Sequence, residues 1–179
     1  MHPRHLFLIG LLLPAACRSS KGVLGSADEV GSGGKLSASW IGSDTGKLTA
    51  PPRAVFCREG SRLELLALNG DAGLGLAIYP VSEVAAGAYD GFEPGADSIR
   101  RPGVTAAVRW FTEKEVEAYQ SDWGSLALTR DGPRIAGNFA LHMRKVGEAE
   151  DSILLNGRFS GVTPGPCPGD SVPPPAPAQ

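Results

Sequence analysis

Apolar and polar residues alternate along most of the chain after residue 35. Leu36, Ala38 and Trp40 alternate with polar neighbours, and in a strand every second side chain faces the same side. The same pattern, separated by turns rich in Gly, Asn and Asp, recurs over residues 53–58, 62–68, 74–79, 104–111, 125–129, 134–143 and 152–162, with a shorter candidate at 87–89. The chain is therefore predicted to form a series of short strands.

About eight or nine short strands with frequent turns are typical of an antiparallel β-sandwich or β-barrel. No strand–helix–strand spacing is visible, which argues against a parallel α/β sheet. Residues 112–119 allow two interpretations, a helical turn favoured by Glu and Lys or a hairpin leading into 116–120. Residues 121–124 are expected to form a turn. The predicted fold is all-β, with at most one short helix.

Two segments repeat a Gly-x-Phe pattern, Gly137-Asn138-Phe139 and Gly157-Arg158-Phe159. Glycine beside an aromatic residue can admit the ring where backbones approach closely. The repeat therefore suggests neighbouring strands that match each other. Coincidence in a glycine-rich chain is an equal alternative.

The first seventeen residues have the features of an export signal. A short basic start at Arg4 precedes an apolar run over residues 6–13, and Ala15 and Ala16 lead directly into Cys17. Such a run is shorter than the roughly 20 residues that cross a bilayer as a helix. It has the length and flanks of the apolar region of a signal peptide.

This N-terminus resembles the signal peptides of bacterial lipoproteins, whose lipobox ends in small residues before an invariant cysteine. The resemblance implies lipidation of Cys17, cleavage before it and acylation of the new amino terminus. Pro14 stands where the family usually has Leu, which here lies one place earlier at Leu13. Arg18, in place of the Asp that retains lipoproteins in the inner membrane, implies an outer-membrane location facing the periplasm or the cell surface.

Two other interpretations of residues 1–17 remain. An ordinary secretory signal could be cleaved near Ala16, with Cys17 present by chance. A mitochondrial presequence fits less well, because the segment is apolar rather than an amphipathic Arg- and Ser-rich pattern. The strands of residues 124–162 also loosely resemble those of uncharacterised β-rich bacterial lipoproteins, a likeness that implies no activity.

Composition divides the rest of the chain. Residues 17–34 are rich in Ser and Gly and are expected to form a lipidated cysteine and flexible tether, with a strand at 22–24 as the alternative. Residues 35–163 form the predicted β-domain, and the Pro-rich segment 164–179 is expected to be an extended tail. Residues 1–16 would be removed as the signal peptide.

The overall composition excludes several classes of protein. Hydrophobic residues make up 42% of the 179 residues, enough for a core. The net charge of −2 argues against a nucleic-acid-binding protein. The 24 glycines and 15 prolines argue against a helical bundle.

Besides Cys17, the chain has only Cys57 and Cys167. The export signal implies an oxidising compartment, in which paired cysteines usually form a disulfide. Cys57 and Cys167 are therefore predicted to be bridged; two separate thiols are the alternative. Two cysteines are too few to form a metal site alone, and neither a metal nor a cofactor is expected.

Candidate catalytic residues are sparse. His142 is the sole histidine after the signal segment, and the alternation places it toward solvent, without a G-x-S-x-G motif in the chain. Glu113, Glu115 and Glu117 could supply paired carboxylates for glycoside hydrolysis, but a solvated strand face is the simpler interpretation. No catalytic residue is proposed from the sequence.

Trp123, in the expected turn, is a candidate for a ligand or partner contact, because an exposed tryptophan often anchors an interface. The alternative is that it caps the end of a sandwich. Trp40 and Trp110 fall on apolar faces and are expected in the core. The favoured function is a non-catalytic binding or envelope-assembly module, anchored to the membrane by its lipid and with an envelope protein as a possible partner. The alternatives are a carrier of lipid or a small ligand in a closed barrel, and a carboxylate-based hydrolase.

Overall fold

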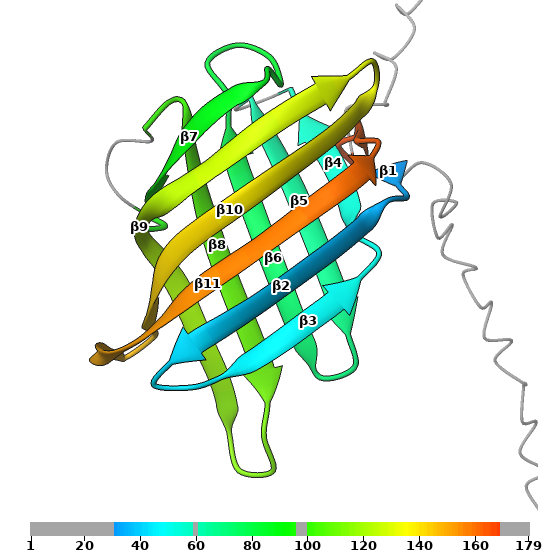
Figure 1. Ribbon diagram of the computed structural model, residues 1–179. Coiled ribbons are helices and arrows are strands. Elements are labelled where there is room, and N and C mark those ends of the chain that lie inside the picture. Colours follow the sequence, from blue (N-terminus) through cyan, green and yellow to red (C-terminus); the bar gives the residue numbers. More distant parts are fainter. Residues whose placement is uncertain (1–30, 59–60, 96–99, 169–179) are drawn as a thin grey trace, which may run out of the picture.

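The computed structural model describes residues 31–58, 61–95 and 100–168, and these residues form one curled β-sheet (Figure 1). Eleven strands follow one path in the order β1-β4-β5-β6-β8-β7-β9-β10-β11-β2-β3, and β12 pairs with β4 beside it. The strands are β1 (Gly31–Ser32), β2 (Lys35–Gly42), β3 (Gly46–Ala50), β4 (Arg53–Cys57), β5 (Arg62–Asn69), β6 (Ala72–Tyr79), β7 (Gly87–Phe92), β8 (Gly103–Phe111), β9 (Val116–Asp131), β10 (Arg134–Lys145), β11 (Glu148–Val162) and β12 (Gly165–Pro166).

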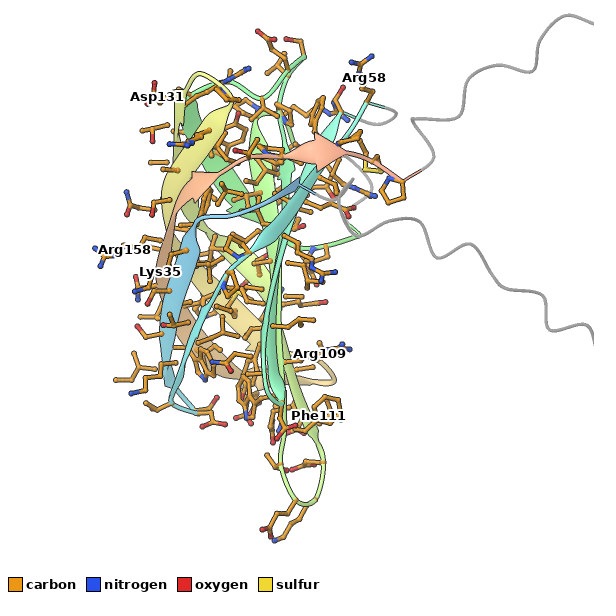
Figure 2. The ribbon with its side chains drawn as sticks, turned by 90° about the vertical axis from the view of Figure 1, so that its right-hand side faces the viewer. Lys35, Arg58, Arg109, Phe111, Asp131 and Arg158 are labelled. Carbon is orange, nitrogen blue, oxygen red and sulfur yellow. A yellow bond between two sulfur atoms is a disulfide. The ribbon has the colours of Figure 1, made fainter. Side chains whose placement is uncertain are left out.

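The sheet folds back on itself to give two layers. In Figure 1, β10, β11, β2 and β3 run diagonally across the front, and β4, β5, β6 and β8 lie behind them. The path ends at β3, which contacts β5 but does not pair with it through backbone hydrogen bonds. One side-chain hydrogen bond joins the two strands there, from Asn69 Nδ2 to the carbonyl of Thr49 at 3.1 Å. The result is a half-barrel whose apolar side chains fill the space between the layers (Figure 2).

The all-β prediction is confirmed, and the described residues contain no helix. The expected number of strands, eight or nine, was too low. The alternation in β3 covers only the four residues 47–50, and β1 and β12 have only two residues each. The sheet is also mixed rather than purely antiparallel, because the β7–β8 and β12–β4 pairs are parallel. Strands β1 and β12 lie beyond the expected bounds of the β-domain, 35–163.

The second of the two interpretations of residues 112–119 is confirmed, because residues 112–115 form the connection of a hairpin and residues 116–119 begin β9. Thr112 organises its turn, since its Oγ1 accepts the backbone N–H of Glu115 at 3.0 Å. The predicted turn at residues 121–124 was wrong. These residues lie inside β9, a single strand of 16 residues. Polar residues and a glycine suggested a turn there, but the strand accommodates them through a β-bulge at Asp122.

Strand β9 changes partner along its length. Its first part pairs with β8 and its later part with β7. Ser121, which is fully buried, lies at this fork. Its hydroxyl donates to the carbonyl of Phe92 at 2.7 Å and accepts the N–H of Ala106 at 2.9 Å. One side chain thus satisfies two buried backbone groups where the strands diverge.

The two Gly-x-Phe segments are cross-strand partners, which confirms that these strands match. Phe139 pairs with Gly157, and Gly137 pairs with Phe159. Each phenyl ring lies where the partner glycine's Cβ would be. The repeat therefore packs two rings against adjacent backbone in the core.

At one end of the core, three aromatic rings form a stack. Trp110 lies between Trp40, with ring centroids 5.0 Å apart, and Tyr119, at 5.4 Å. Gly46 leaves room for the Trp40 ring, which would collide with any Cβ there. Trp40 is buried and Trp110 packs against the core, as predicted.

The predicted disulfide between Cys57 and Cys167 is present, with the two Cα atoms 4.6 Å apart. It joins the end of β4 to the residue that follows β12. The bridge, which spans 110 positions of the chain, therefore ties the C-terminal end of the described domain to β4.

Candidate functional site

A β-bulge in β9 builds the candidate site. His142 of β10 pairs with Trp123, but the next residue, Met143, pairs with Ser121, so Asp122 has no partner. An extra residue of this kind bends a strand and re-aims side chains. Ser121 remains buried inside, while Trp123 is 57% exposed on the outer face. The bulge thus brings Asp122 and Trp123 to the same side of the sheet, as their shared contacts with His142 show.

The indole of Trp123 stacks on the imidazole of His142, with ring centroids 5.0 Å apart and planes 8° apart. His142 was expected to face solvent; it does lie on the outer face, but Trp123 partly covers it. Trp123 is held on paired strands rather than on a loop. It remains more than half exposed although one side of the ring is occupied.

Charged side chains adjoin the stack. Asp122 Oδ2 lies 3.6 Å from His142 Nδ1, and Asp122 Oδ1 accepts a hydrogen bond from Arg144 Nη2 at 3.0 Å. The same nitrogen lies 3.4 Å from Glu93 Oε2, and Gln120 Nε2 donates to Glu93 Oε1 at 3.5 Å. Exposed ion pairs add only about 0–1 kcal/mol each to stability. Their main consequence here is to fix the side chains around Trp123.

An apolar row continues from the stack across the sheet. Trp123, His142, Leu154 and Ile41 are successive cross-strand partners on β9, β10, β11 and β2. Leu154 is 47% and Ile41 is 62% exposed. With about 4.8 Å between strands, the row is about 14 Å long. We call these four residues the Trp123 row.

The Trp123 row is one side chain wide. The next row on the same face, formed by successive partners, is made of small or polar residues: Ser125, Ala140, Asn156 and Ser39. On the other side of the row lie Arg144 and its partner Ser152. The exposed apolar surface is therefore a narrow stripe within a polar face.

Sequence reasoning singled out Trp123 and His142 but missed their neighbours. Asp122 was assigned to a turn, and Glu93 and Arg144 carried no motif. Ile41 and Leu154 gave one usable signal, since each is an apolar residue at a position where the alternation requires a polar one. Only the register of the strands brings these residues together.

The structure gives the other candidates different roles. Glu117 lies 3.3 Å from Lys145 Nζ, and Glu148 lies 3.2 Å from the same atom. Hydrogen bonds to Glu148 and then Glu117 raise the pKa of Lys145 above its ordinary value. Glu113 and Glu115 lie in the connection between β8 and β9. Cys17 lies outside the described residues, as do residues 1–16 and 169–179.

Several hollows, among them a pocket and a groove, lie away from Trp123. A pocket of about 280 Å³ near the disulfide is lined mainly by apolar residues, and Arg130 borders it while donating to the carbonyl of Val84 at 2.8 Å. A shallow polar groove of about 360 Å³ includes Lys35 and Arg158, which project from the outer face of β2 and β11 (Figure 2). Neither this pocket nor this groove contains an exposed tryptophan or a fixed network of charges.

Within residues 31–58, 61–95 and 100–168, no three His, Cys, Asp or Glu side chains are grouped to hold a metal ion. Over the same ranges, no helix has the length and apolar character needed to span a bilayer. No protein-family model matches the chain, and no curated protein or solved structure is significantly similar to it.

Proposed function

We propose that this protein is a lipid-anchored module of the cell envelope, held in the outer membrane, that binds a ligand or partner without catalysis. The N-terminal sequence supports the anchor, since an apolar run and two alanines precede Cys17. The exposed Trp123, fixed by a bulge and stacked on His142, supports binding. This tryptophan is the observation on which the proposal rests.

The Trp123 row and the polar side chains at its edge, those of Glu93, Gln120, Asp122 and Arg144, make up what we call the Trp123 face. Its features support a binding function. Tryptophan is enriched among the residues that dominate binding energy. A side chain already ordered before binding loses less conformational entropy when the ligand arrives. Asp122 and Arg144 are likewise ordered by their ion pair at 3.0 Å. The face is thus prepared for binding without rearrangement.

The interior offers less support for a carrier function. Side chains from both layers fill the space between them, and the rings of Phe139 and Phe159 pack directly onto glycines of the adjacent strand. A ligand is therefore better accommodated on the outer face. The hydrolase alternative is weaker still, because Glu117 is engaged by Lys145.

Metabolic labelling with a palmitate analogue tests the anchor. We expect the wild-type chain to be labelled and to fractionate with the outer membrane, and Cys17→Ala to lose both properties. Cys167→Ala is the control and should stay labelled. Equal labelling of wild type and Cys17→Ala would contradict the anchor.

Photo-crosslinking in intact cells tests the binding face. A photoreactive amino acid replaces Ser125 in one variant and Phe111 in another. Ser125 is exposed two residues from Trp123 on the same face, so the tryptophan is kept. Phe111 is 54% exposed and lies at the end of β8, where it pairs with Val116 beside the turn between β8 and β9 (Figure 2). We expect an adduct from position 125 and none from position 111. Equal yields, or no adduct from position 125, would rule out this face.

A further inference from the structure

We infer that the ligand of the Trp123 face is a carbohydrate, an inference that rests on the proposed function and specifies it. A sugar ring presents a flat patch of C–H groups, and these carry slight positive charge. The face of an indole is electron-rich and apolar. Trp123 offers such a face, since it is 57% exposed with its other side on His142.

Polar groups at the edge of the ring match the hydroxyls of a sugar. A hydroxyl both donates and accepts hydrogen bonds. Asp122 and Glu93 supply acceptors, while Arg144 and Gln120 supply donors. These groups already contact one another, so a ligand would meet them in fixed positions, and hydrogen bonds to charged groups are the stronger kind.

The charge of the site favours a neutral glycan over a phosphate-bearing ligand. Two carboxylates, Asp122 and Glu93, stand against one guanidinium, that of Arg144. A site for phosphate or nucleic acid would instead gather cations. The sequence is not basic overall either, with a net charge of −2.

The shape of the Trp123 row favours a narrow, extended ligand over a protein surface. A stable protein interface covers about 800 Å² on each partner and has a broad apolar centre. Here the apolar surface is one side chain wide and is bordered by Ser, Ala and Asn residues. A linear oligosaccharide crossing the strands from Trp123 toward Ile41 fits this stripe.

Binding of polysaccharides by the full chain in detergent tests the inference. The probes are peptidoglycan sacculi, chitin and cellulose in pull-down assays, followed by titration with soluble oligosaccharides of the retained polymer. We expect at least one polymer to retain the wild-type protein. Trp123→Ala should weaken binding about tenfold or more, Trp123→Phe should weaken it less, and Phe111→Ala should leave it unchanged.

Tryptophan fluorescence gives a second measurement. The retained oligosaccharide should change the emission of the wild type, and Trp123→Ala should abolish this change although Trp40 and Trp110 remain. The same unfolding midpoint in wild type and Trp123→Ala would show that the fold is intact.

The experiments separate the carbohydrate inference from the proposed binding function. Retention by none of the three polymers, or equal retention of wild type and Trp123→Ala, would overturn the carbohydrate inference. A protein adduct at position 125 together with such a result would leave the proposed binding function in place and assign a protein partner instead. Absence of any adduct as well would overturn both.

Discussion

The phenyl ring of Phe139 lies over Gly157, its partner on the neighbouring strand, and occupies the space that a Cβ would need. Gly137 and Phe159 form the reciprocal pair on the same two strands. Both rings are buried. The glycines are therefore part of the core packing, because they let aromatic rings approach the backbone of β10 and β11.

Gly157→Ala is expected to destabilise the fold by about 1–3 kcal/mol, since the added methyl group must displace the Phe139 ring in a packed core. Gly87→Ala is the matched control. Gly87 also lies in a strand, but its added Cβ would meet no atom within 4 Å. Urea unfolding measures both effects. A loss for Gly157→Ala no larger than that for Gly87→Ala would show that the ring can move aside without cost.

Ser121→Ala is expected to destabilise the fold by about 2–4 kcal/mol. The substitution leaves the carbonyl of Phe92 and the N–H of Ala106 buried without their partner, and each unsatisfied group costs about 1–3 kcal/mol. Ser125→Ala, at an exposed position of the same strand, should change stability by about 0.5 kcal/mol or less. Chemical denaturation compares the two, and similar midpoints for both variants would contradict the bridging role.

Removal of the disulfide, by Cys57→Ser with Cys167→Ser, is expected to lower the free energy of unfolding by about 2–5 kcal/mol. The bridge closes a long loop, across a sequence separation of 110, and so restricts the unfolded chain. In the wild type, a reductant should lower the thermal unfolding midpoint by as much as the double substitution does. In the double variant, the reductant should leave the midpoint unchanged. A wild-type midpoint indifferent to complete reduction would refute this role.

Alkaline pH is expected to destabilise the fold through Tyr89. Burial raises the pKa of its phenol above the ordinary value of 10.0, and its hydroxyl donates to the carbonyl of Ala85 at 2.7 Å. The folded state therefore favours the neutral phenol. Its stabilisation is complete below pH 10.0 and is lost as the pH rises through the raised pKa of the folded state.

Tyr89→Phe tests this pH dependence. The variant should lose about 0.5–1.5 kcal/mol at neutral pH with the hydrogen bond, and its stability should fall less between pH 9 and 11 than that of the wild type. Urea unfolding across this range measures both. Equal slopes in the two proteins would mean that Tyr89 does not carry the effect.

Local pattern was sufficient for much of the fold. The alternation of apolar and polar residues located most strands, because consecutive side chains of a strand point to opposite faces of the sheet. The Gly-x-Phe repeat correctly suggested that residues 137–139 and 157–159 are neighbours. Local pattern failed at residues 121–124, where polar residues and a glycine mimic a turn but serve a bulge within β9.

Only the tertiary structure defined the candidate site. Ile41 and Leu154 are far apart in the chain and become neighbours through the register of β2 and β11. Asp122 reaches His142 and Arg144 because one unpaired residue shifts the register of β9 against β10. Register depends on how the whole sheet packs, so no short segment of sequence encodes it.

The sequence by itself determined an all-β domain and a pair of cysteines suited to a bridge, and it singled out a tryptophan that the structure shows to be exposed. Each of these follows from residue type and local period. The tertiary structure decided that the strands form a curled, mixed sheet, and that Trp123 stands on a bulge, stacked on His142, at the head of an apolar row. The physical reason is that the register between strands depends on burying the apolar side chains of the whole core. The tendency to form a strand, in contrast, depends on residues that are close together in the chain.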